Sequence, residues 1–212
     1  ENALLALAST PPALPAAARK MERVMEQALR TAPLIDHMRI FGRKQDTAPG
    51  PVKISEALDG ARTIIGGRLQ NSNVTLAVEL AADLPAVTGQ AVLIEQVLLN
   101  LLANACDAYL GIEPTSAAPR RIDVTGALEG RMVAVRVADH AGGIPEAVLS
   151  RVFEPFFTTK PPGQGTGLGL SISYGIIHDL GGTLSARNTG DGAMFELRLP
   201  AEDGAVAAPR RA

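Results

Sequence analysis

The chain has 212 residues, of which 46% are hydrophobic and 20% charged, and its formal net charge is −2 at pH 7. This composition is typical of a folded globular protein and excludes a disordered chain, while the near-neutral charge argues against a nucleic acid or an anionic membrane as partner. The single cysteine, Cys106, excludes an internal disulfide, and no apolar run approaches the length of a membrane span. Because the chain begins at Glu1 inside an apolar periodic segment, we expect a cytoplasmic fragment of a longer protein.

The first 46 residues predict helices that pack along another helix. Apolar residues recur there at alternating spacings of three and four, which is the pattern of a heptad seam. The seam consists of Met21, Val24, Ala28, Thr31, Ile35 and Met38. Residues 1–9 resemble the end of a partner helix. The segment is either a two-helix appendage or half of a dimeric four-helix bundle, and we favour the dimer because two short helices alone bury little.

Residues 47–51 form a Pro/Gly linker, residues 52–201 a mixed α and β domain, and residues 202–212 a disordered tail. Periodicity predicts helices at 55–70, with Ser55 as N-cap, and at about 90–109 and 168–180. Alternating or apolar runs predict strands at 74–80, 121–128, 131–139, 183–188 and 193–200, with a hairpin around Glu129 and Gly130. Several strands with helices on one face make a two-layer α/β sandwich.

The helix around residues 95–109 carries a polar stripe beside its apolar face. The apolar face consists of Ile94, Val97, Leu98, Leu101, Ala105 and Ala108, and the stripe of Gln96, Asn100, Asn104 and Asp107. A solvated face would more often use Lys, Glu or Arg, because Asn is a poor helix former. Amide oxygens one turn apart suit a hydrated hard cation such as Mg²⁺ instead.

Three loops add further polar groups. Asp139 ends a strand beside glycines, where its carboxylate can either accept a hydrogen bond from an adenine amino group or make an Asx-type turn. Residues 151–160 combine three phenylalanines with a Thr-Thr-Lys, which indicates an apolar anchor followed by a lid. GTGLGL, at 165–170, precedes a helix and is either a phosphate loop or a plain turn.

In this order the four stretches resemble the ATP-binding domain of sensor histidine kinases, within the GHKL ATPase superfamily. QVLLNLLANACDA is similar to the N box, ADHAGGI to the G1 box, VFEPFFTTK to the F box and GTGLGLS to the G2 box. The resemblance covers about residues 52–200, and the preceding helices are similar to the dimerisation and phosphotransfer bundle. It implies that the chain binds ATP and Mg²⁺, forms a homodimer through the helical bundle and passes a phosphoryl group to a response regulator.

The resemblance also implies roles for particular residues. Asn104 matches the asparagine that coordinates Mg²⁺, and Asn100, one turn earlier, is the polar residue near the γ-phosphate and a possible second metal ligand. Asp139 matches the residue that reads the adenine amino group. The remaining residues implied to bind nucleotide are Asp107, Gly143, Ile144, Thr159, Lys160, Gly165, Thr166, Gly167, Leu168, Gly169 and Leu170. One departure is Ala141, which stands where the G1 box usually has its first glycine.

The chain lacks the histidine that accepts the phosphoryl group in this family, which is followed by an acidic residue on the first bundle helix. His37 is followed by Met38, His140 lies in the G1 loop, and His178 lies near the end of the last helix. We therefore expect the acceptor upstream of Glu1, and no autophosphorylation of this fragment.

Two other functions compete with this one. A GHKL ATPase of the gyrase B or MutL kind would have a glutamate as general base where this chain has Asn100, and an amide cannot act as a base. A non-catalytic nucleotide-binding or scaffold module that dimerises through its helices is the other alternative.

Overall fold

The computed structural model describes residues 49–110, 112, 120–161 and 165–202. The chain divides into two compact units, Glu1–Asp46 with Thr158–Thr166 and Thr47–Phe157 with Gly167–Ala212. The second unit holds the α/β domain. The predicted helical bundle with its seam and His37 lies outside the described residues, as does residue 203 onward of the predicted tail.

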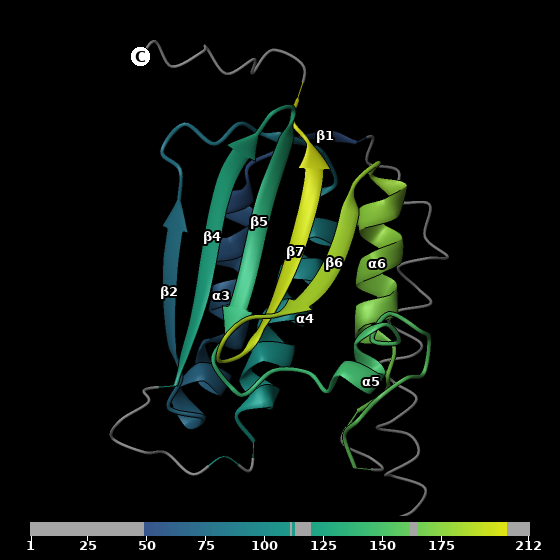
Figure 1. Ribbon diagram of the computed structural model, residues 1–212. Coiled ribbons are helices and arrows are strands. Elements are labelled where there is room, and N and C mark those ends of the chain that lie inside the picture. Colours follow the sequence, from purple (N-terminus) through teal and green to yellow (C-terminus); the bar gives the residue numbers. More distant parts are fainter. Residues whose placement is uncertain (1–48, 111, 113–119, 162–164, 203–212) are drawn as a thin grey trace, which may run out of the picture. The chain divides into compact units, whose positions relative to one another are not determined.

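A five-stranded sheet with the order β2-β4-β5-β7-β6 forms one layer of the domain (Figure 1). The strands are β2 (Thr75–Leu80), β4 (Arg121–Glu129), β5 (Met132–Asp139), β6 (Thr183–Asn188) and β7 (Ala193–Pro200). β2 runs parallel to β4, and the other neighbouring pairs run antiparallel. The predicted hairpin is confirmed, since Glu129 pairs with Met132 across Gly130, whose φ is +65°.

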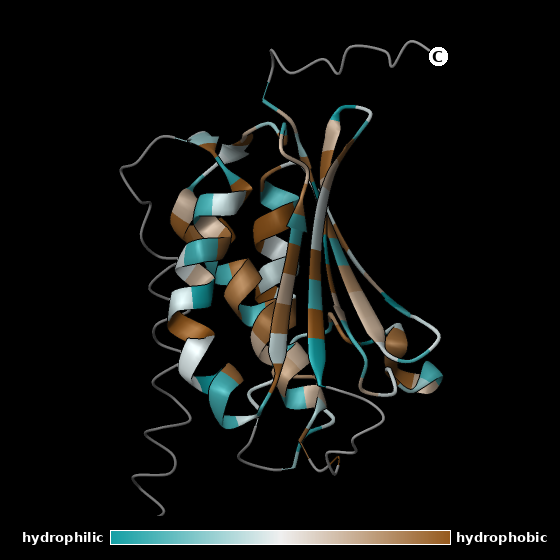
Figure 2. Ribbon diagram, turned by 90° about the vertical axis from the view of Figure 1, so that its left-hand side faces the viewer, coloured by the Kyte–Doolittle hydropathy of each residue, from teal (hydrophilic) through white to brown (hydrophobic). Residues whose placement is uncertain are grey.

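Helices α3 (Ile54–Asn71), α4 (Ala91–Ala108) and α6 (Gly169–Asp179) cover one face of this sheet, as the edge-on view in Figure 2 shows. α5 (Glu146–Leu149) is a single turn. The predicted two-layer α/β sandwich is therefore confirmed. α4 packs against both α3 and α6 and buries seven residues. By length and composition α4 could cross a membrane, but these buried residues make it the central helix of the core.

Two predictions about these helices are wrong in detail. Lys53, not Ser55, is the N-cap of α3, and no side chain caps this helix, so Ser55 lies within its first turn. Ala108 is exposed, and the buried side of α4 turns instead toward Leu102 and Cys106. The core pattern drifts in this way because a helix with 3.6 residues per turn presents a slightly different face with each turn.

A small antiparallel sheet of β1 (Gly50–Val52) and β3 (Val87–Gly89) was not predicted. Pro/Gly composition indicates a linker up to residue 51, yet Gly50 pairs with Gly89. Three-residue strands are too short to show a period of two, so their pairing depends on tertiary contacts.

On the face of the sheet that no described helix covers, four charged side chains form a closed ring. Arg136 pairs with Glu129 and Glu196 at 2.5 Å, and Arg198 pairs with the same two carboxylates at 2.6 Å. Burial alone would raise the pKa of Glu196, but hydrogen bonds from Arg198 and Arg136 together lower it. The ring thus joins β4, β5 and β7 on their outer side.

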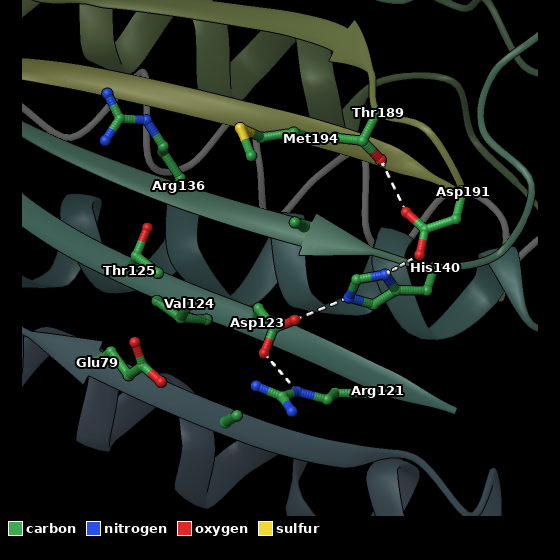
Figure 3. Close-up of a pocket in the computed structure, with 12 residues that line it drawn as sticks. Glu79, Arg121, Asp123, Val124, Thr125, Arg136, His140, Thr189, Asp191 and Met194 are labelled. Carbon is green, nitrogen blue, oxygen red and sulfur yellow. Dashed lines mark hydrogen bonds and ion pairs between the residues drawn. The ribbon is translucent and has the colours of Figure 1, made fainter. Parts of the chain in front are cut away.

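A hollow of about 280 Å³ lies on the same face, and Figure 3 shows the side chains that line it. His140 lies there between two carboxylates: Nε2 is 2.7 Å from Asp123 of β4, and Nδ1 is 2.7 Å from Asp191 of the β6–β7 turn. Only the imidazolium can donate to both carboxylates at once. The hydrogen bond to Asp123, and then the one to Asp191, raise the pKa of His140.

We predict that this contact stabilises the fold below neutral pH. Since the folded pKa of His140 is raised, its contribution is complete below the ordinary value of about 6.5 and is lost as pH rises through the folded value. His140→Gln should lower the free energy of unfolding at pH 6 by about 1 kcal/mol or less, the range of partly exposed ion pairs, and by less at pH 9. Urea unfolding at the two pH values measures this difference.

His178→Gln is the matched control, because His178 is exposed, stacks on Tyr174 and has a single exposed carboxylate, that of Asp179, at 4.0 Å from Nδ1. Equal losses for His140→Gln at both pH values would show that the ring acts through packing and not through its charge.

Candidate functional site

The polar stripe of α4 meets the start of α6. Asn100 Nδ2 donates to Ser173 Oγ at 2.9 Å, and Ser173 is a buried polar side chain of α6. Asn104 lies one turn further along α4 and is half-buried. Gln96, one turn before Asn100, has a buried Oε1 with no hydrogen-bond partner among the described residues. The structure thus joins the N box to the helix that follows the G2 box.

The glycines of GTGLGL are places of close packing. At Gly167, where φ is +66°, a Cβ would lie within 3 Å of the backbone of Phe156. At Gly169 a Cβ would meet the side-chain oxygen of Asn100 just as closely. Any side chain at these two positions would displace the Phe156 backbone or the Asn100 side chain. The two glycines therefore allow the F box and the N box to pack closely against the start of α6. Leu168 is buried and Leu170 packs against the core.

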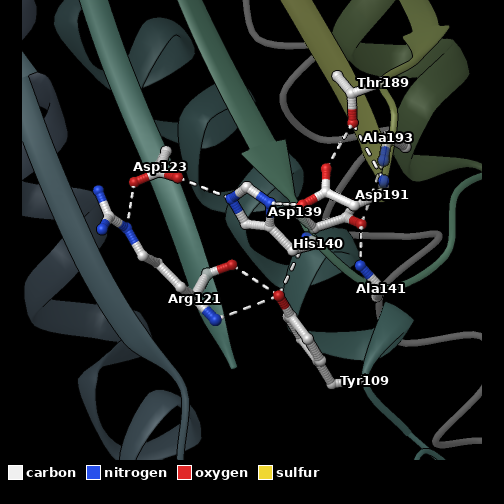
Figure 4. A network of polar contacts seen from close by, with 10 residues as sticks. Tyr109, Arg121, Asp123, Asp139, His140, Ala141, Thr189, Asp191 and Ala193 are labelled. Atoms are coloured by element: carbon white, nitrogen blue, oxygen red, sulfur yellow. Dashed lines mark hydrogen bonds and ion pairs between the residues drawn. The ribbon is translucent and has the colours of Figure 1, made fainter. Parts of the chain in front are cut away.

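Asp139 ends β5 as a buried carboxylate with 4% of its surface exposed (Figure 4). Its Oδ1 accepts hydrogen bonds from the backbone N–H of Ala141 at 3.0 Å and of Ala193 at 3.3 Å. Within the described part of the chain no donor reaches Oδ2. Burial raises the pKa of Asp139, although the two backbone hydrogen bonds oppose this. The free oxygen is suited to a ligand that donates a hydrogen bond.

The G1 turn after Asp139 is held by an asparagine of β6. Gly142 and Gly143 have φ of +86° and +83°. Asn188 Oδ1 accepts from Ile144 N at 2.8 Å, and Asn188 Nδ2 donates to Ile144 O at 2.7 Å. Ala141 does not have a positive φ, so alanine there introduces no backbone strain.

Tyr109, directly after α4, ties the N box helix to the G1 loop. Its hydroxyl donates to Arg121 O at 2.6 Å and accepts from His140 N at 3.0 Å, as Figure 4 shows. The roles of Tyr109, Asn188 and Ser173 were not predicted, because each acts across a long stretch of sequence. No local pattern distinguishes these three from the other residues of their helices and strands.

Asp107 pairs with Arg68 of α3 through Nη2. The carboxylate side chain is only 11% exposed, so the predicted contact to a nucleotide would have to share it with the guanidinium. No sequence pattern predicts that Arg68 is the partner of Asp107.

The F box supplies an apolar anchor, as expected. Phe153 packs against the core and lies 6.5 Å from Phe195 and 5.4 Å from Tyr174, measured between ring centroids. Phe156, by contrast, is 70% exposed and has a φ of +65°.

The predicted lid residues Thr159, Lys160, Gly165 and Thr166 belong to the other compact unit. Within that unit, Thr158 Oγ1 accepts a hydrogen bond from Lys160 N at 3.1 Å. Gly165 lies against the Thr158 side chain, since a Cβ there would be 2.7 Å from Oγ1.

The residues present fit Mg²⁺ better than a tightly ligated transition metal. In the described stretches of the chain, no group of three or more His, Cys, Asp or Glu side chains is placed to hold a metal. The amide oxygens of Asn100 and Asn104 are hard ligands of the kind that Mg²⁺ takes in addition to water and phosphate oxygens.

Comparison with known proteins agrees with this arrangement. A family model described as histidine kinase-, DNA gyrase B-, and HSP90-like ATPase matches residues 89–203. The two-component sensor PprA of Pseudomonas aeruginosa is 40% identical over 193 residues, which are 91% of this chain and 20% of that protein. The sensor protein FixL of Bradyrhizobium diazoefficiens is 34% identical over 199 residues, covering 92% of this chain and 38% of that protein.

The solved catalytic domain of histidine kinase ThkA is similar at a TM-score of 0.61 and 29% identity, over 73% of this chain and 97% of that one. The chain spans about a fifth of the length of PprA. The family match includes all four boxes, and the sheet and helices agree with a histidine kinase catalytic domain. The chain therefore belongs to the histidine kinase-, DNA gyrase B-, and HSP90-like ATPase family, as the catalytic domain of a sensor histidine kinase.

Proposed function

We propose that this domain binds ATP with Mg²⁺ and transfers the γ-phosphoryl group to a histidine, from which it passes to a response regulator. The observation that carries the proposal is the buried Asp139 carboxylate, whose Oδ1 is held by two backbone N–H groups while no described donor reaches Oδ2. An adenine amino group is a suitable donor for this oxygen, and a guanine carbonyl is not.

The other residues of the site supply positioning and charge. Asn104 and Asn100 would hold Mg²⁺ through their amide oxygens, and the bound cation would neutralise phosphate charge during in-line transfer. No side chain caps the start of α6 at Leu168, and the N–H groups of its first turn and the positive end of the helix dipole would face phosphate oxygens. Gly143 and Ile144 would form the turn beneath the base. Thr159, Lys160, Gly165 and Thr166 would act from the lid.

Hydrolysis by a clamp-type ATPase is less well supported. Such an enzyme needs a general base one turn before the Mg²⁺ asparagine, where this chain has Asn100, and the amide of Asn100 donates to Ser173. A non-catalytic nucleotide-binding scaffold remains the competing function, and phosphoryl transfer distinguishes it from the kinase.

The proposed partners are a second copy, through the helices of residues 1–46, and a response regulator. Histidine kinase ThkA has been solved in complex with the response regulator protein TrrA. That complex motivates the second partner, and the heptad seam motivates the first.

We predict that Asp139→Asn weakens ATP binding by about 1 to 3 kcal/mol, because the amide presents a donor where the adenine amino group needs an acceptor. The same substitution should raise the melting temperature of the nucleotide-free domain. The folded pKa of Asp139 is raised by burial, so the ionised carboxylate destabilises the fold above its ordinary pKa, and asparagine carries no charge there.

Calorimetry with ATP and GTP, together with thermal unfolding, measures both effects. Asp83→Asn is the matched control, since Asp83 is exposed in the β2–β3 turn. An unchanged preference for ATP over GTP in the Asp139→Asn variant would contradict the adenine assignment.

Asn104→Ala is expected to raise the Mg²⁺ concentration needed for ATP binding while leaving metal-free ADP binding nearly intact, because the amide serves the cation and not the base. Titration of Mg²⁺ at fixed ATP measures the first quantity and calorimetry with ADP and a chelator the second. A parallel loss of both would mean that the substitution only disturbs α4.

The chain of residues 1–212 incubated with labelled Mg-ATP should form no acid-labile phosphohistidine. Both ring nitrogens of His140 are engaged with carboxylates, and His178 lies nine residues along α6 from Gly169, about 13 Å from the proposed phosphate site. His37 lacks the following acidic residue of an acceptor. Label on any of the three histidines, located by mass spectrometry, would contradict this prediction.

A further inference from the structure

The side-chain amide of Asn100 contacts two residues one turn apart on α6, Gly169 and Ser173. Its Nδ2 donates to Ser173 Oγ at 2.9 Å, and its Oδ1 lies against the α-carbon of Gly169, four residues earlier on the same side of that helix. The amide therefore spans from the first residue of α6 to the next turn. Ser173 is 2% exposed, and no other hydrogen bond to its side chain occurs among the described residues.

The two ends of this contact favour one orientation of the amide. The N-terminus of α6 has unpaired N–H groups and a positive dipole end, so an oxygen is favoured beside Gly169 and a donor is disfavoured there. Ser173 Oγ accepts from the nitrogen at the other end. Asn100 Oδ1 is consequently held at the N-terminal end of α6, where the proposed function needs an oxygen ligand.

The space around the amide is as restricted as its orientation. A Cβ on residue 169 would come within 3 Å of Asn100 Oδ1 and its carbonyl carbon and would lie 3.0 Å from Nδ2, so the whole amide faces Gly169 with its oxygen nearest. Asn100 lies on α4, which packs against α6, and its hydrogen bond to Ser173 holds the amide beside that helix.

We propose that Ser173 is a positioning residue for the Mg²⁺–ATP site: its hydroxyl fixes the side-chain amide of Asn100 with the oxygen toward the start of α6. This inference rests on the proposed function, which it extends from the residues that touch the ligand to one that acts through Asn100. Ser173 itself contacts neither the nucleotide nor the metal.

Ser173→Ala in the chain of residues 1–212 tests the role. Loss of one hydrogen bond should raise the Mg²⁺ concentration for half-maximal ATP binding about threefold to tenfold and leave metal-free ADP binding unchanged. In an Asn100→Ala background the same substitution should have no further effect, because the group through which Ser173 acts is gone. Ser185→Ala is the control, since Ser185 is an exposed serine of β6 and Asn100 donates to Ser173 instead.

A second measurement needs no nucleotide. The side-chain amide signals of Asn100 in an NMR spectrum of the ligand-free domain should shift in Ser173→Ala and remain in place in Ser185→Ala. Unmoved signals would refute the contact itself. Equal losses of Mg-ATP and metal-free ADP binding would refute the positioning role and make Ser173 a purely structural residue.

The same experiments separate this inference from the proposed function. If the unmodified domain binds no nucleotide, the proposed function and the positioning role both fail, even where the amide signals shift. If the unmodified domain binds Mg-ATP but Ser173→Ala behaves like Ser185→Ala, the positioning role fails alone.

Discussion

The contacts that join the N box to α6 and to the G1 loop depend on α4, whose apolar side lies in the core. α4 buries Leu101 and its neighbours and packs against α6. This packing places Asn100 within hydrogen-bond distance of Ser173. The end of the same helix brings the Tyr109 hydroxyl to Arg121 and to the backbone of His140. One packed helix thus sets the distance between the proposed metal ligands and the G1 loop.

The glycines before α6 have a different physical meaning from the one that a phosphate motif suggests. A bare backbone is required at Gly167 because Phe156 lies against it, and at Gly169 because Asn100 does. These requirements hold without any ligand. The proposed phosphate contact is compatible with this close packing. The phosphate oxygens would contact backbone N–H groups at the start of α6, whereas the α-carbons of Gly167 and Gly169 face the other boxes. The motif therefore has a packing role in addition to the proposed phosphate contact.

The sequence was sufficient to predict the sheet and the three long helices, because their residues alternate or recur with a clear period over six or more positions. It was not sufficient for β1 and β3, which are too short to show a period, or for the N-cap of α3, where Ser55 is one residue inside the helix. The roles of Asn188 and Arg68 were not predictable either. Each pairs with a residue about 40 positions away, and such a partner is fixed only by the fold.

Asp139 illustrates how a local and a functional interpretation of one residue can both hold. An Asx-type turn and an adenine contact are alternatives at the level of sequence, since each uses the same carboxylate. In the structure the turn uses only Oδ1, which accepts from Ala141, and the backbone of Ala193 adds a second bond to that oxygen. Two N–H groups compensate only part of the burial of a charge, as the raised pKa of Asp139 indicates. A ligand that donates to Oδ2 would supply a further hydrogen bond, so the same burial that destabilises the ionised carboxylate would strengthen its interaction with a bound donor.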